Sequence, residues 1–82
     1  MPRKFTFHDS LHVLKRSCER WVTEAEIRET VLTGSVIETG QRGVHGGLKR
    51  LYKKFLTNRV VVVVAETHKT DCYLITTYEE ER

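Results

Sequence analysis

The stretch Arg59-Val60-Val61-Val62-Val63-Val64-Ala65 decides the fold of this chain. Its five consecutive valines are β-branched, which disfavours a helix, and they leave no polar side chain to face water on either side. Such a run is typical of a central strand that is buried on both faces and paired on both edges. We therefore expect residues 59–65 at the centre of a sheet, with neighbouring strands supplied by the flanking sequence.

The segment after the valines supplies one neighbour. Residues 66–71 are expected to form a loop, and residues 72–78 that follow are rich in β-branched and aromatic side chains, as strands are. Before the valines, Thr57-Asn58 is a natural two-residue turn between antiparallel strands.

Residues 48–56 are ambiguous by pattern alone. Their apolar side chains follow the helical spacing i, i+3, i+4, i+7, i+8, with basic residues on the opposite side. A valine strand left unpaired along one edge, however, would be an aggregation hazard. We therefore expect residues 48–56 to form a strand that pairs antiparallel with residues 59–65.

Two helical segments precede these strands. Asp9 or Ser10 can cap a first helix that runs toward Arg20. Thr23, with Glu26 three residues later, forms the pattern of a capping box and starts a second helix.

The second helix leads into the strands through glycine-rich sequence. Gly34 is placed to end the helix as a left-handed cap, and residues 35–39 alternate weakly, as a short edge strand does. Residues 40–47 contain four glycines, which indicates either mobility or a close backbone approach, and we favour a flexible connection.

The fold class expected is α+β, a single domain over residues 1–82 with an ordered core of about residues 5–79. Two N-terminal helices pack on one face of a four-stranded antiparallel sheet in the order ααββββ.

Size and charge narrow the functions available to the chain. With 82 residues it has room for one small core, which excludes a two-domain enzyme with a cleft between lobes. Its 14 Lys+Arg and 11 Asp+Glu give a net charge of +3, yet residues 39–65 contain no acid. A basic centre between acidic flanks suits a polyanion better than a membrane, and a merely solvated basic strand is the alternative. The basic residues of this centre are Arg42, Lys49, Arg50, Lys53, Lys54 and Arg59.

Cysteine and histidine usage bears on location and cofactors. Cys18 and Cys72 are too few for a disulfide scaffold, and the longest apolar run, residues 60–65, is too short to span a bilayer. The four histidines lack the close pairing of zinc ligands. We therefore expect a soluble cytoplasmic protein that uses no metal or other cofactor and does not bind a membrane.

Three residues of the first helix could carry chemistry. His12, Arg16 and Arg20 fall at i, i+4 and i+8, so they share one helical stripe. An imidazole with a pKa of about 6.5 can move protons near neutral pH, and guanidinium groups one turn away can hold a phosphate. These groups suffice for metal-free RNA cleavage, in which the ribose 2′-hydroxyl is the nucleophile. The alternative is an exposed helix face whose arginines form ion pairs.

A second group of residues lies on the strands. Cations with aromatic side chains between them can hold a nucleic-acid backbone and stack a base, and an ordinary wet sheet face is the alternative. A DNA-reading helix at residues 23–33 is disfavoured because its three glutamates would face a DNA groove. The strand group consists of Lys49, Tyr52, Lys53 and Lys54 with Thr76 and Tyr78 of the last strand.

Five short motifs, in order along the chain, resemble those of the DUF4258 and phage-type members of the barnase, EndoU, colicin and RelE-like (BECR) superfamily of ribonuclease toxins. The resemblance implies two helices on a four-stranded antiparallel sheet, a strand at residues 48–56, and a metal-independent, toxin-like ribonuclease. The chain departs from the family pattern at residues 40–47, which have no counterpart in the motifs of the family. The motifs are residues 12–16, 21–30, 50–55, 60–64 and 74–78.

The leading hypothesis, a small RNA-cleaving domain, assigns roles to individual residues. His12 would transfer the proton, Arg16 and Lys53 would stabilise the phosphorane, and Tyr52 or Tyr78 would position the ribose or base. Thr76 matches the last motif, and Arg20, Arg42, Lys49, Arg50 and Lys54 would bind RNA. The expected partners are RNA and an antitoxin or immunity protein. A catalytically silent module that binds RNA or protein is the alternative.

The remaining histidines are expected to have no such role. His45 and His68 lie in predicted loops, which lack a rigid scaffold to hold catalytic geometry.

Overall fold

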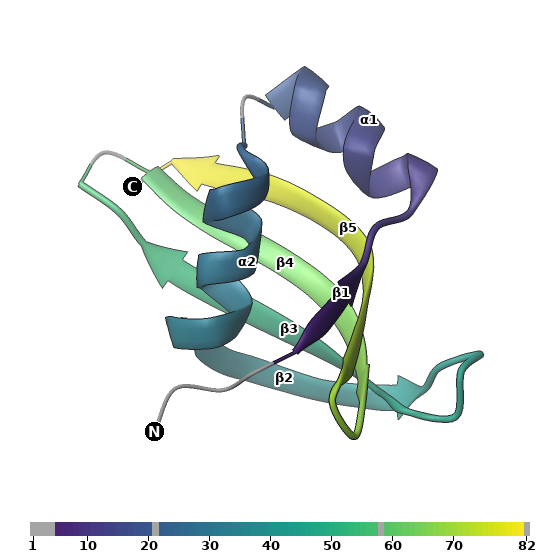
Figure 1. The fold of residues 1–82 in the computed structure, drawn as a ribbon. Helices are drawn as coiled ribbons and strands as arrows, with labels where there is room; N and C mark the ends of the chain where they lie inside the picture. Colours follow the sequence, from purple (N-terminus) through teal and green to yellow (C-terminus); the bar gives the residue numbers. More distant parts are fainter. Residues whose placement is uncertain (1–4, 21, 58, 82) are drawn as a thin grey trace.

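The computed structural model describes residues 5–20, 22–57 and 59–81. Within these residues the chain forms two helices and one mixed sheet, which confirms the α+β class (Figure 1). The elements in chain order are β1 (Thr6–His8), α1 (Leu11–Arg20), α2 (Glu24–Thr33), β2 (Ser35–Arg42), β3 (Leu48–Phe55), β4 (Arg59–His68) and β5 (Asp71–Glu81).

The sheet has five strands in the described residues, in the order β1-β5-β4-β3-β2. The expectation of four antiparallel strands was therefore wrong in two respects. Strand β1 was missed, and it runs parallel to β5, with Phe7 opposite Cys72. Because β1 is only 3 residues long, it is too short to show the alternation by which a strand is recognised in sequence.

Strand β4 lies at the centre of the sheet, as the valine run predicts. Val61 and Val63 are buried on one face, and Val60 and Val62 are buried on the other. The expected loop at residues 66–71 was too long, because β4 continues to His68 and β5 begins at Asp71. The hydrophobic run shows where the strand is buried but not where its backbone pairing ends.

The strands that flank β4 confirm two further expectations. Strand β3 pairs antiparallel with β4, with Tyr52 opposite Val63, so the helical spacing in this segment is overridden by sheet pairing. Strand β2 is an edge strand, as expected, but it reaches Arg42. The predicted turn contains Asn58, which lies outside the described residues.

One core joins both helices to the sheet. In Figure 1, α2 crosses β3 and β4, whereas α1 lies beside β5. Val13 of α1 and Ile27 of α2 both belong to the core cluster, which confirms that the helices share a core with the sheet. In the described part of the chain, neither helix has the length and apolar composition needed to cross a bilayer. The buried residues of the core are Val13, Val22, Ile27, Val31, Tyr52, Val61, Val63, Ala65, Cys72 and Leu74.

The ends of α2 show one confirmed and one corrected expectation. The capping box is present, since the Glu26 amide donates to Thr23 Oγ1 at 3.1 Å and the Thr23 amide donates to Glu26 Oε1 at 3.0 Å. Gly34 has φ −75° and ψ 170°, so it is extended and not left-handed. A Cβ at Gly34 would lie 2.4 Å from the Thr30 carbonyl oxygen and 2.8 Å from that of Lys53. Glycine is therefore needed for close approach between α2 and β3.

Candidate functional site between α1 and strand β5

An extra residue in β5 sets which side chains face which way. Ala65 of β4 pairs with Leu74, but the preceding Val64 pairs with Thr76, so Ile75 is left over as a bulge. Leu74 is consequently buried in the core, while Thr76 lies on the side of the sheet away from α2. We call this side the outer face, and it is marked by Lys53, Val62 and Tyr78, which lie across from one another on three adjacent strands.

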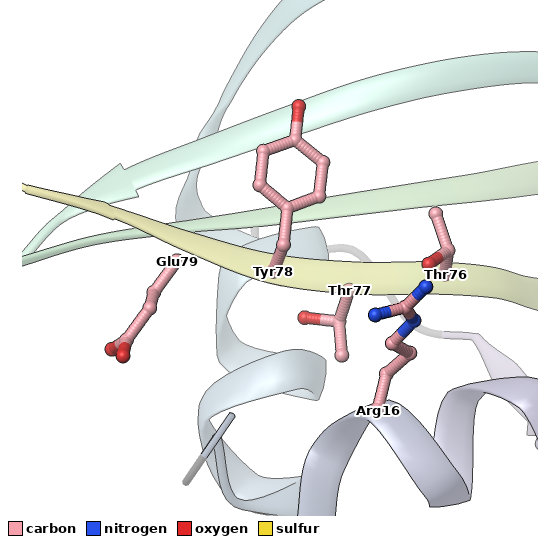
Figure 2. A pocket seen from close by; sticks show the side chains of 5 residues that line it. All are labelled: Arg16, Thr76, Thr77, Tyr78 and Glu79. Carbon is pink, nitrogen blue, oxygen red and sulfur yellow. The ribbon is translucent and has the colours of Figure 1, made fainter. Parts of the chain in front are cut away.

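Helix α1 brings its predicted residues against this part of β5. His12 Nε2 lies 3.1 Å from Thr76 Oγ1. Arg16, one turn later, lines a pocket of about 290 Å³ with Thr76 and Tyr78. Figure 2 shows Arg16 reaching from the helix toward Thr76, while Tyr78 points away from the helix. Four residues predicted on two separate elements are thus brought together at one edge of the sheet.

The predicted residues of β3 divide between the two faces. Lys53 lies on the outer face, where its Nζ contacts Glu80 Oε2 at 3.2 Å. Tyr52 points the other way and is 1% exposed in the core, so it cannot stack on a base. Lys54 also points toward α2, where its Nζ binds Glu29 Oε1 at 2.7 Å. Along the sequence these residues form one basic segment, and only the alternation of side chains in a strand divides them between two faces.

The other predicted RNA-binding residues are more scattered. Arg42 is exposed at the end of β2, and Lys49 of β3 lies opposite Glu66 of β4 on the outer face. Arg50 lines a smaller pocket of about 170 Å³. The side chain of Arg20 lies outside the described part of the structure.

A second, larger pocket of about 400 Å³ adjoins His12 on the outer face. It lies between the start of α1, strand β5 and the glycine-rich loop of residues 43–47 that joins β2 to β3. The sequence did not predict this pocket. Since His12 lines this pocket and also contacts Thr76 of the first, the two pockets meet at one pair of side chains. The lining residues are Ser10, His12, Val44, His45, Lys49, Glu66, Tyr73, Leu74 and Ile75.

The glycine-rich loop is anchored, which corrects the expectation of a flexible connection. The buried carboxylate of Glu66 accepts hydrogen bonds from the backbone amides of His45, at 2.9 Å, and Gly47, at 2.8 Å. A Cβ on Gly43 would lie 1.8 Å from Glu66 Oε1, so only glycine lets the backbone pass this side chain. Two features of the sequence point to this anchor. One is Glu66, the acid that follows residues 59–65, and the other is the set of glycines in residues 40–47, which can indicate close backbone approach.

Aromatic stacking fixes the ring of His45 as well. The ring lies 3.7 Å from the ring of Tyr73 between centroids, at an interplanar angle of 7°. His8 of β1 stacks on the same Tyr73 at 4.6 Å and also contacts Asp71 Oδ1 at 3.0 Å. His45 is therefore held by its backbone and by its ring, although it lies in a loop.

Ion pairs tie the far end of the sheet to α2. Arg59 contacts the carboxylates of Glu26 and Glu79. Burial opposes ionisation of Glu26, but hydrogen bonds from the Thr23 backbone and the Arg59 guanidinium outweigh it and lower the pKa of Glu26. Hydrogen bonds to Glu26 and Glu79 raise the pKa of Arg59. Arg59 itself lines neither pocket, although its partner Glu79 lines the first.

The thiol of Cys72 is buried in the core. Burial raises the pKa of the Cys72 thiol to about 12, so this side chain is a core residue and not a nucleophile. Among the described residues, no three His, Cys, Asp or Glu side chains gather in the manner of a metal site.

Comparisons with known proteins identify a family, but no individual curated protein or solved structure. Neither the curated proteins nor the solved structures include a significant match to this chain. Residues 10–79, which include both helices and strands β2 to β4, match a domain of unknown function, DUF4258. The matched region contains every residue that lines the two pockets. The chain therefore belongs to the DUF4258 family.

Proposed function

We propose that this protein is a small, metal-independent ribonuclease that cleaves RNA through its own 2′-hydroxyl group. The observation that carries the proposal is the contact of His12 with Thr76, 3.1 Å apart, beside the pocket lined by Arg16 and Tyr78. A proton-transfer group, a permanent cation and a hydroxyl are thus held on two packed elements. The resemblance of the five sequence motifs to those of the BECR ribonuclease toxins belongs to this proposal.

The chemistry follows from the groups present. His12 takes the proton of the ribose 2′-hydroxyl as its oxygen attacks phosphorus. The bond from phosphorus to the 5′-oxygen then breaks, and this oxygen takes up a proton from water, which leaves a 2′,3′-cyclic phosphate and a 5′-hydroxyl. The His12 imidazolium returns its proton to the solvent. Arg16 stabilises the charge on the pentacoordinate phosphorane, and Thr76 holds the imidazole in place through its hydroxyl.

Binding of the RNA backbone is assigned to the outer face. Lys53 lies next to Tyr78 there, with Val62 between them, so a strand of RNA over β5 and β4 would meet a cation and an aromatic ring in turn. Glu80 now pairs with Lys53, and a phosphate of the RNA would replace this carboxylate. Tyr78 positions the ribose or base.

The alternative is a catalytically silent module of the same fold. It is favoured by Val36 and Ile37 of the edge strand β2, which are 40% and 51% exposed. Exposed apolar side chains on an unpaired edge suit a protein partner, such as an antitoxin or immunity protein that adds a strand.

Cleavage of a mixed RNA pool in the presence of a chelator tests the proposal. The wild type should produce 2′,3′-cyclic phosphate ends, and His12→Ala should lower the rate by about 10²- to 10⁴-fold with the fold intact by circular dichroism. His68→Ala, an exposed histidine outside both pockets, is the control and should cleave as the wild type does. Absence of chelator-resistant cleavage, or full activity of His12→Ala, would show that the mechanism is wrong. RNA binding without cleavage would favour the silent module.

A further inference from the structure

We propose that the stacked rings of His45 and Tyr73 are a platform for one nucleobase of single-stranded RNA, bound in the 400 Å³ pocket beside His12. The inference rests on the RNA-binding part of the proposed function and assigns a subsite to it. His45 acts here as a flat ring, not as an acid or base.

The first support is that the platform is already formed. The two rings are 3.7 Å apart and within 7° of parallel, which is the geometry in which a further flat ring can be added to a stack. His45 is exposed and lines the pocket, so its ring is accessible from the space that a base would fill. Base stacking on His and Tyr rings is the usual means by which proteins bind unpaired RNA.

The second support is that the loop does not have to be ordered on binding. The His45 and Gly47 amides bind the Glu66 carboxylate, and the Gly43 amide donates to the Gly47 carbonyl oxygen at 2.9 Å. Glu66 is 2% exposed and stands on the central strand β4, so the loop is attached to the most rigid part of the sheet. A platform fixed in this way avoids the entropy cost of immobilising a loop when the ligand binds.

The third support is the composition of the pocket. Val44 and Ile75 provide apolar walls for the faces and edges of a base, while Lys49 provides a cation for a neighbouring phosphate. A mostly apolar pocket with few polar groups is the usual form of a small-ligand site. A base held here would place its own nucleotide next to His12, which lines the same pocket. The platform would thereby set the position of the scissile phosphate.

The experiment measures binding without cleavage. The probe is a short 2′-O-methyl oligonucleotide with a fluorescent end label, which lacks the nucleophilic hydroxyl. Its affinity is measured for the wild type, His45→Ala and His45→Phe. His45→Ala should weaken binding by about 5- to 140-fold, the effect of losing one stacked base, and His45→Phe should bind as the wild type does.

Two controls separate stacking from a structural effect. His8→Ala removes a ring that also stacks on Tyr73 but does not line the pocket, and it should leave affinity unchanged. A probe with an abasic site at each position in turn should lose its dependence on His45 at one position. A loss in His45→Ala that is equal for abasic and intact probes would overturn the inference, as would wild-type affinity in His45→Ala.

The same measurements keep this inference apart from the proposed function. RNA cleavage with no effect of His45→Ala on binding would overturn the platform and leave the ribonuclease standing. Binding that depends on His45 without any cleavage would support the platform and overturn the ribonuclease. No binding of the probe by the wild type would overturn the platform.

Discussion

The backbone amide of His45 donates to the carboxylate of Glu66 across 2.9 Å, so an exposed loop is held by a buried side chain of the central strand. Glu66→Ala would leave this amide and that of Gly47 without an acceptor. We expect it to lower the free energy of unfolding by about 1–3 kcal/mol and to speed hydrogen exchange at both amides. Glu66→Gln, which keeps an acceptor oxygen, should lose less. Unchanged exchange in Glu66→Ala would contradict the anchoring role.

Two adjacent lysines should differ in their effect on RNA binding. Lys53 lies on the outer face and Lys54 faces α2, where it pairs with Glu29. Lys53→Gln should weaken binding and reduce the slope of log affinity against log salt by about 1, because one phosphate contact is lost. Lys54→Gln should leave the slope unchanged. Equal slopes for the two variants, measured by a salt titration, would place the RNA elsewhere.

Close packing at Gly34 gives a prediction for stability. An added Cβ would collide with two backbone oxygens, those of Thr30 and Lys53, which cannot rotate away as a side chain does. Gly34→Ala should therefore destabilise the protein by about 1–3 kcal/mol in a urea titration. Gly40→Ala is the matched control, since its Cβ would come no closer than 3.4 Å to the atoms around it. Similar midpoints for the two variants would show that α2 can move off β3 at little cost.

The lowered pKa of Glu26 makes stability depend on pH in the acid range. Because its pKa is below the ordinary 4.5 in the folded state, ionised Glu26 stabilises the fold above pH 4.5, and this stabilisation is lost as the pH falls through the folded pKa. Glu26→Gln should cost about 1 kcal/mol at pH 7, and its deficit relative to the wild type should shrink below pH 4.5. Glu24→Gln, at a more exposed position, should cost less at both pH values. A deficit that does not change with pH would exclude the ion pair with Arg59 as its cause.

The fold could be predicted from sequence wherever a pattern repeats over several residues. The valine run located β4, and its need for partners identified β3 despite the helical spacing in that segment. The capping box located the start of α2. Strand β1 gave no such pattern, because it has only three residues and its pairing with β5 joins segments that are far apart in the sequence. Gly34 was assigned a left-handed cap because a steric need for glycine looks the same in sequence as a conformational one.

The candidate site was predicted in part for a similar reason. Helical spacing joined His12 to Arg16, and the last strand supplied Thr76 and Tyr78, but the contact between them depends on how α1 docks. His45 was set aside because loops usually lack rigidity, and the anchor that supplies it, Glu66, is far away in the sequence. Two glycines of the loop serve close approach to β4: Gly43 passes this carboxylate, and Gly47 passes the backbone of Thr67.

Strand β5 comes last among the described elements, and this order determines when the candidate site can form during synthesis. Both β1 and α1 rest on β5, and His12 and Thr76 are 64 positions apart. During synthesis the first helix must therefore wait, with its apolar side uncovered, until the last strand has left the ribosome. Neither pocket exists before that moment, because both are lined by β5. A nascent chain is consequently without its site until translation of this domain is complete.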